Sequence, residues 1–185
     1  MVKEIQSETE RRMQKTIESM QGELAGIRSG KATPALLDGV KVQAYGQKTP
    51  LNQLSSISVP DPKSLLVQPW DKSIIGDVVK AIQAAELGLN PQAEASVIRI
   101  PIPPLSEERR KELVKLCKKI AEDNRVAVRN IRRDANDQLK KAEKDKSVSE
   151  DQMHDGMDVI QKATDKYIKK IDELMDAKEK EIMSV

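Results

Sequence analysis

The chain has 185 residues, enough for one or two domains with their own hydrophobic cores. Its 32 basic and 30 acidic residues give a net charge of only +2, which excludes polyanion binding by overall charge and leaves that role to a local patch. The single cysteine, Cys117, excludes an internal disulfide, and no apolar run approaches the length of a signal peptide or a membrane span, so we expect a soluble, cytoplasmic protein.

The positions of the prolines divide the chain into three segments. All nine lie between Pro34 and Pro104. Because the interior of a helix excludes proline, the two flanking segments are predicted to be helical and the middle segment to have another structure.

The first segment predicts a helix from Lys3 to about Ser29, with Gly30 as its C-cap. Gly22 and Gly26 each reduce helix propensity by about 1 kcal/mol, so this helix needs to pack against neighbours. Its apolar residues recur mostly at 4,3 spacing, at Ile5, Met13, Ile17, Met20, Leu24 and Ile27.

The middle segment, residues 31–104, predicts a small α/β domain. One short amphipathic helix is expected from Ser73 to Glu86, before Gly88. Runs rich in β-branched residues predict strands at 40–46, 54–60, 64–70 and 97–103.

The last segment predicts two more helices. Ser106 is a good N-cap for a helix that continues to about Asp145, roughly 58 Å long at 1.5 Å per residue. The sequence SEDQ at 149–152 is a capping box that begins the next helix. The apolar stripes comprise Leu113, Leu116, Cys117, Ile120, Val128, Ile131, Ala135 and Leu139, and then Met153, Met157, Ile160, Tyr167, Ile171, Leu174 and Ile182.

Three helical stripes predict an elongated three-helix bundle, formed by residues 1–30 and 105–185, into which the α/β domain is inserted. The fold class is therefore α+β. The chain crosses between the two domains twice, and glycine or proline in both crossings suggests a limited hinge, although a rigid elbow fits the sequence equally well. The candidate hinge residues are Gly30, Lys31, Pro103, Pro104, Leu105 and Ser106.

Patterns typical of catalysis are absent from the sequence. The only histidine, His154, fits a solvated surface position, and Cys117 lies on an apolar stripe where a buried structural thiol is expected. No phosphate-binding glycine loop or metal-ligand spacing is present. We therefore expect no enzymatic activity, no catalytic residues, no metal and no cofactor.

Four of the ten arginines lie within positions 125–133, which contain no acidic residue. Helical geometry places Arg125, Arg129 and Arg132 within about 60° of one another, on a solvent ridge opposite or beside the apolar stripe. An ordinary exposed face paired with nearby acids is the alternative. However, lysine outnumbers arginine by 22 to 6 elsewhere, and guanidinium groups suit bidentate phosphate contacts, which favours polyanion binding. With few aromatic residues for base stacking, the ridge predicts recognition of folded RNA through its backbone.

The chain resembles the bacterial ribosome recycling factor family along its whole length. The resemblance rests on IRSGKATPALLDGV at 27–40, ELGLNP at 86–91, IRIPIPPLSEERRKEL at 98–113, RVAVRNIRRDAND at 125–137 and KSVSED at 146–151. It implies an L-shaped molecule of tRNA-like dimensions. It also implies that the protein binds large-subunit rRNA in the space between the ribosomal subunits. With elongation factor G and GTP, it would then split the post-termination ribosome, so that mRNA and deacylated tRNA leave.

The resemblance also implies which residues contact rRNA. The family's arginines fall on Arg129, Arg132 and Arg133, next to Arg125 of the same ridge, with further contacts at Arg28, Arg109 and Arg110. Lys31 stands where the family usually has arginine, which keeps the charge but loses a bidentate fork. We expect a monomer that binds the ribosome and elongation factor G but no membrane. The alternative from another class is a coiled-coil-like adaptor that binds proteins through its helical faces.

Overall fold

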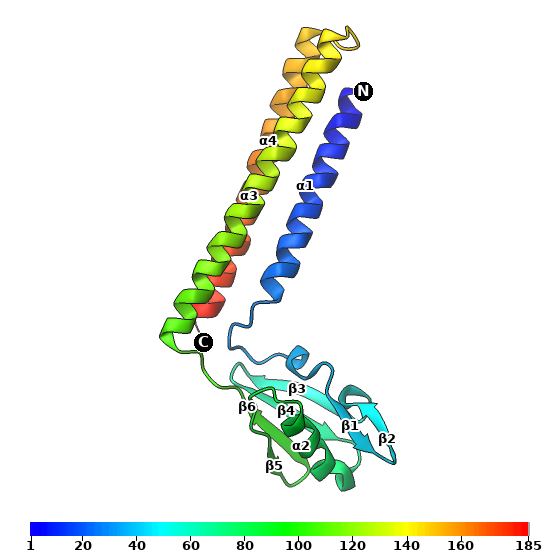
Figure 1. The fold of residues 1–185 in the computed structure, drawn as a ribbon, viewed down its shortest axis with the longest axis vertical. Helices are drawn as coiled ribbons and strands as arrows, with labels where there is room; N and C mark the ends of the chain where they lie inside the picture. Colours follow the sequence, from blue (N-terminus) through cyan, green and yellow to red (C-terminus); the bar gives the residue numbers. More distant parts are fainter. Residues whose placement is uncertain (185) are drawn as a thin grey trace. The chain divides into compact units, whose positions relative to one another are not determined.

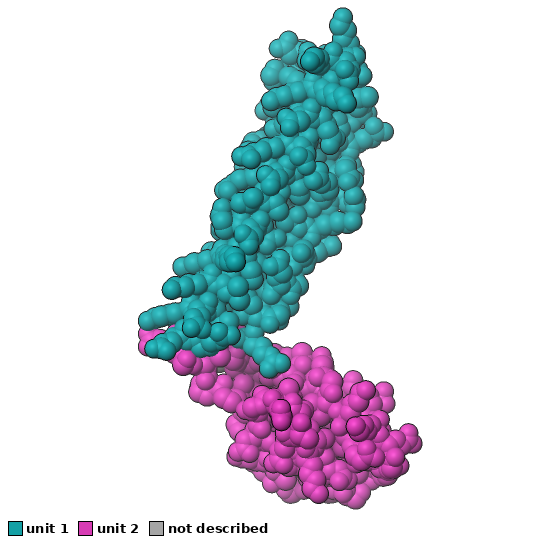
Figure 2. All heavy atoms as spheres, in the orientation of Figure 1, with its two compact units in different colours: residues 1–28, 108–184 teal, residues 29–107, 185 magenta. Residues whose placement is uncertain are grey.

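The computed structural model describes residues 1–184, which form two compact units (Figures 1 and 2). Unit 1 contains residues 1–28 and 108–184, and unit 2 contains residues 29–107. Unit 1 is helical and unit 2 contains the β-strands, which confirms the expected α+β class. Residue 185, where the helical domain was expected to end, lies outside the described residues.

Unit 1 consists of three long helices that run side by side: α1 (Val2–Ala25), α3 (Glu107–Lys144) and α4 (Glu150–Met183) (Figure 1). A tight turn joins α3 to α4, where Lys146 has a φ of +59°. The predicted capping box is confirmed, because the Ser149 hydroxyl accepts a hydrogen bond from the Gln152 backbone and the Gln152 side chain accepts one from the Ser149 backbone. The two helices therefore form an antiparallel hairpin, against which α1 packs.

The predicted apolar stripes line the interior of unit 1, where most of their residues are buried and Ile5, Met157 and Leu174 are partly buried, but one residue is exposed. Leu113, Cys117 and Ile120 are buried, but Leu116 is 43% exposed. At 100° per residue, Leu116 points about 70° away from the mean direction of the other three, beyond the width of a three-helix seam. Leu116 was therefore wrongly assigned to the core.

The end of α1 also differs from the prediction. The helix ends at Ala25 with Gly26 as its C-cap, at a right-handed φ of −70°. Gly30 is not a helix cap: it lies in the connection that follows, with a φ of +77°. A Cβ atom on Gly30 would lie 3.0 Å from the Leu105 Cγ atom, so both its backbone conformation and its packing require glycine.

Gly22 has no such requirement. It lies inside α1, and a Cβ atom at this position would meet no atom within 4 Å. Replacing Gly22 with alanine should therefore raise the free energy of unfolding by about 0.5–1 kcal/mol, because alanine loses less backbone entropy in a helix. Thermal unfolding followed by circular dichroism measures the change, and a lower melting temperature would show that the glycine has a structural role.

Unit 2 contains a four-stranded antiparallel sheet and a separate hairpin. The sheet has the order β3 (Ser55–Asp61), β4 (Ser64–Pro69), β6 (Val97–Pro101) and β5 (Gln92–Glu94). The hairpin pairs β1 (Lys41–Ala44) with β2 (Gln47–Pro50), and α2 (Ile75–Ala84) packs against β1. Three short 3-10 helices complete the unit, at Pro34–Leu37, Leu51–Gln53 and Lys72–Ile74.

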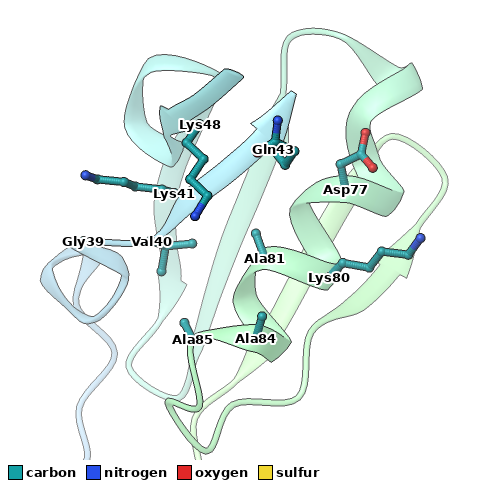
Figure 3. Close-up of a pocket in the computed structure, with 10 residues that line it drawn as sticks. All are labelled: Gly39, Val40, Lys41, Gln43, Lys48, Asp77, Lys80, Ala81, Ala84 and Ala85. Atoms are coloured by element: carbon teal, nitrogen blue, oxygen red, sulfur yellow. The ribbon is translucent and has the colours of Figure 1, made fainter. Parts of the chain in front are cut away.

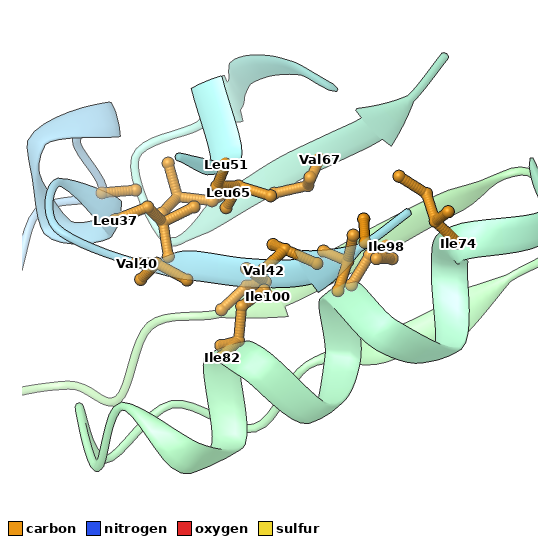
Figure 4. Close-up of a cluster of buried hydrophobic side chains, with 13 residues drawn as sticks. Leu37, Val40, Val42, Leu51, Leu65, Val67, Ile74, Ile82, Ile98 and Ile100 are labelled. Atoms are coloured by element: carbon orange, nitrogen blue, oxygen red, sulfur yellow. The ribbon is translucent and has the colours of Figure 1, made fainter. Parts of the chain in front are cut away.

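Alternate side chains of the central strands build the core of unit 2. On β4 Leu65 and Val67 are fully buried, and on β6 Ile98 and Ile100 are fully buried, as the period of two along a strand requires. The hairpin and α2 cover this face with Val42 and Ile82 (Figure 4), and Val78 of α2 belongs to the same buried cluster. The hairpin and α2 thus form a layer that covers one face of the four-stranded sheet.

The predicted strands at 40–46, 54–60, 64–70 and 97–103 are confirmed as β1, β3, β4 and β6, and the predicted helix as α2. Strands β2 and β5 were missed. Both are short and polar, and β5 is exposed at all three positions. Each is a strand because its backbone pairs with a neighbouring strand. This pairing does not require apolar residues at alternate positions, so the sequence of β2 and β5 contains no strand pattern.

Candidate nucleic-acid interface

The arginine cluster lies in the middle of α3, beside the buried seam that includes Val128 and Ile131. The ridge lies beside the core seam, which is one of the two positions that the sequence allowed. Arg125, Arg129 and Arg132 are all partly buried, because the apolar stems of long basic side chains lie along the protein surface while their charged ends stay in solvent. Of the four arginines, only Arg133, which lies further around the helix, is exposed.

Arg125 is largely enclosed, with 19% of its side chain exposed. Its Nε and Nη2 atoms donate to Asp172 Oδ1 on α4, at 2.9 and 2.6 Å, and Nη1 donates to Glu122 Oε2 at 3.1 Å. Burial alone would lower the pKa of Arg125, but these hydrogen bonds outweigh it and raise the pKa above its ordinary value. Arg125 therefore clamps α3 to α4, and its guanidinium group is already occupied.

The other three arginines are progressively more available. Arg129 reaches Glu122 Oε1 only at 3.4 Å, and its side chain is 42% exposed. Arg132 donates from one nitrogen to the neutral Gln161 Oε1 atom at 3.1 Å. Arg133 has no hydrogen-bond or ion-pair partner among residues 1–184. The part of the cluster best placed to contact an external anion is therefore its C-terminal end.

Asp134, which follows Arg133 in the sequence, forms an ion pair with α1. Asp134 Oδ2 accepts a hydrogen bond from Arg12 Nη2 at 3.0 Å. Asp134 is thus engaged across the bundle, which leaves Arg132 and Arg133 without a competing carboxylate from this neighbour. Both guanidinium groups keep donors for a bidentate phosphate contact.

The remaining predicted site residues do not join this cluster. Arg109 pairs with Glu112 Oε2 at 2.8 Å near the start of α3, and Arg110 follows it with an Nε atom that is shielded and lacks a hydrogen-bond partner within the described chain. Arg110 is fifteen positions before Arg125, about 22 Å along a helix. Arg28 is exposed in unit 1, whereas Lys31 is exposed in unit 2.

Sequence reasoning missed the residues of α4 that decide which arginines are free. Asp172 and Gln161 lie 47 and 29 positions from the arginines that they contact, and no local pattern in the sequence connects them. Asn136 lies one turn after Arg132, and its Oδ1 atom is shielded from solvent and finds no hydrogen-bond donor among residues 1–184.

Other reactive side chains have structural surroundings. Cys117 is fully buried, and burial raises the pKa of its thiol, so the thiol remains protonated. His154 is exposed, with its Nε2 atom 3.7 Å from Glu150, as predicted for a surface histidine. Within residues 1–184, no group of His, Cys, Asp or Glu side chains is placed to hold a metal ion. None of the described helices has the length and apolar character needed to cross a membrane.

These features define a class of protein: a long three-helix unit with guanidinium groups suited to a phosphate backbone, joined to a small antiparallel α+β unit. The family model described as "Ribosome recycling factor" matches residues 20–183. The chain belongs to the ribosome recycling factor family.

Individual relatives agree with this assignment. The chain is 57% identical to the ribosome-recycling factor of Symbiobacterium thermophilum and 54% identical to that of Bacillus subtilis, over 100% of both chains in each case. A solution structure of a ribosome recycling factor matches all of this chain and 98% of its own, with 46% identity and a TM-score of 0.71. A second match is the T. thermophilus ribosome recycling factor, from models that place it and E. coli elongation factor G on the E. coli post-termination complex. It has 47% identity, 98% coverage of both chains and a TM-score of 0.62.

Proposed function

We propose that this protein is a ribosome recycling factor of the cytoplasm. It binds the post-termination ribosome and, with elongation factor G and GTP, splits it into subunits, so that mRNA and deacylated tRNA are released. Family membership supports this function, as does the related complex that contains both elongation factor G and a post-termination ribosome. The protein itself catalyses no reaction and acts as a mechanical component.

The observation that carries the RNA-binding part of the proposal is the state of Arg132 and Arg133. They lie on a 38-residue helix, one with a neutral partner and one with no partner among the described residues. Guanidinium groups that are not neutralised by carboxylates attract phosphate oxygens, and a rigid helix fixes their spacing. We propose that they contact the rRNA backbone of the large subunit, with Arg129 as an additional contact and Arg125 as the residue that positions the helix. Arg28, Lys31, Arg109 and Arg110 supply secondary contacts.

Sedimentation with purified large ribosomal subunits tests this function directly. The protein should co-sediment, and its affinity should fall steeply as the salt concentration rises, because phosphate contacts release counterions. An adaptor that binds proteins through apolar helical faces would bind with little dependence on salt. Absence of co-sedimentation at low salt would contradict the proposal.

We also propose that the two crossings act as a hinge. Each crossing is anchored to unit 2: Ala32 N donates to Pro62 O and Ile102 N donates to Lys63 O, both at 2.8 Å. Gly30 packs against Leu105, so the crossings also contact each other. The candidate hinge residues are therefore Gly30 and Lys31 in one crossing, and Pro103, Pro104, Leu105 and Ser106 in the other.

Replacing Pro103 and Pro104 with glycine tests the hinge. Proline restricts φ, so the double variant should sample more orientations of unit 2. Ribosome binding should remain nearly normal, because Arg132 lies more than 20 residues further along α3. Subunit splitting with elongation factor G, followed by light scattering, should fall several-fold, because a loose joint absorbs the applied force. Loss of both activities would indicate misfolding, and retention of both would show that stiffness here has no role.

A further inference from the structure

The turn between β1 and β2 holds an aromatic residue in an unfavourable backbone conformation. Ala44 pairs with Gln47, so Tyr45 and Gly46 form a two-residue loop, with φ values of +54° and +78°. Positive φ at both positions is typical of a type I′ turn, in which asparagine or aspartate usually precedes glycine. A tyrosine there costs about 1 kcal/mol or more. Strain of this kind is characteristic of functional positions.

The side chain of Tyr45 is held at the surface. It is 66% exposed, and its hydroxyl donates a hydrogen bond to Asp71 Oδ2. Asp71 is fixed in turn, because its Oδ1 atom accepts hydrogen bonds from the backbone and the hydroxyl of Ser73, at 2.9 and 2.7 Å. The tyrosine ring is therefore oriented by a network and presents its apolar faces without entering the core of unit 2.

Trp70 lies directly before Asp71 and is 69% exposed. Tyr45 and Trp70 are the only aromatic residues of unit 2, and neither contributes to its core. Tryptophan and tyrosine are the residues that most often supply binding energy at protein interfaces. Because Trp70 precedes Asp71 in the chain, its backbone lies next to the carboxylate that holds Tyr45, and we call these two exposed residues the aromatic pair.

A basic groove lies along the same hairpin as Tyr45. Its volume is about 420 Å³, and it lies between the hairpin and α2, with Val40, Ala81, Ala84 and Ala85 among its lining residues (Figure 3). Lys41, Lys48 and Lys80 line it against a single acid, Asp77. No ion pair or hydrogen bond joins these lysines to another residue of the described chain. The groove therefore carries an uncompensated positive charge next to small apolar side chains.

We propose that the aromatic pair and the basic groove form a docking surface for a protein segment that carries aspartate or glutamate side chains beside an apolar anchor. The rings supply apolar contact area, and the three lysines supply charge complementarity. A nucleic acid fits less well, because the carboxylates of Asp71 and Asp77 flank the surface and lysine lacks the bidentate fork that favours phosphate. This surface is built from unit 2 alone and does not depend on the arginines of α3.

Photocrosslinking in a reconstituted complex tests the surface. Trp70 is replaced by p-benzoylphenylalanine in the full chain. Because Trp70 is exposed, this replacement leaves the core of unit 2 unchanged. The probe mixture contains purified post-termination ribosomes and elongation factor G. We expect a crosslink to a protein segment that contains acidic residues, mapped by mass spectrometry. A crosslink to rRNA, a crosslink to a protein segment without acidic residues, or no crosslink would each overturn the proposal.

Charge reversal supplies the second measurement. In the protein that carries the crosslinker at position 70, the further change Lys48→Glu should lower the crosslink yield about fivefold, because the new carboxylate repels the acidic side chains of the partner. The matched control is Lys63→Glu, which makes the same change in net charge on the β3–β4 turn, outside the groove. Equal yields in the two variants would overturn the charge complementarity. Sedimentation of both variants with large subunits, through the arginines of α3, separates failure of this surface from failure of the proposed function.

Discussion

Replacing Arg132 and Arg133 with glutamate is expected to weaken binding to large ribosomal subunits about 100-fold. Each arginine offers a charge-assisted contact worth about 1.4 kcal/mol, and a tenfold change in affinity corresponds to the same free energy. Neither arginine forms an ion pair within residues 1–184, so the substitution breaks no internal pair. The slope of the logarithm of the binding constant against the logarithm of the salt concentration should also become shallower, by about 0.7–0.9 for each phosphate contact that is lost.

The control for this experiment is the double change of Lys3 and Lys15 to glutamate. Both lysines are exposed on α1, and their replacement alters the net charge by the same amount. An equal loss of affinity in the control would mean that binding depends on overall charge and not on this part of α3. Unchanged affinity in the arginine variant, with normal helix content by circular dichroism, would remove α3 from the RNA interface.

The change Leu139→Ala is expected to destabilise unit 1 by about 2–5 kcal/mol. Leu139 has no exposed surface and packs in a cluster with Ala135, Met153 and Ile160 at the α3–α4 end of the bundle. Gly156 faces it so closely that a Cβ atom there would lie 3.1 Å from a Leu139 methyl group. The backbones already approach tightly, so the bundle cannot collapse much further around the cavity that alanine leaves.

Leu116→Ala is the matched control, because it removes the same atoms from the same helix at a position that is 43% exposed. Its expected cost is about 0.5 kcal/mol. Urea unfolding followed by circular dichroism measures both variants, and hydrogen exchange of the α3 and α4 amides assigns the loss to unit 1. Similar midpoints for the two variants would show that the cluster around Leu139 does not limit the stability of the bundle.

The sequence by itself determined the elements that depend on local patterns. The proline distribution separated the helical flanks from the inserted strands, because proline is incompatible with a helix interior wherever it stands. The capping box at Ser149 and Gln152 was predicted correctly, since its two hydrogen bonds join residues three apart. The same holds for β4 and β6, whose apolar residues repeat every second position, and for the location of the arginine cluster on α3.

Only the tertiary structure decided which of these residues are free to act. Arg125 has no acid in its own cluster, yet it is occupied by Asp172 from α4, because antiparallel helices bring distant positions together. Arg133 is unpaired among the described residues, whereas Asp134, its neighbour in the sequence, pairs with Arg12 of α1. The exposed aromatic pair of unit 2 was likewise not predictable from the sequence, because no local pattern indicates the positive φ of Tyr45 or its hydrogen bond to Asp71. Helix and strand patterns depend on neighbouring residues, whereas the availability of a charge or a ring depends on partners that the fold supplies.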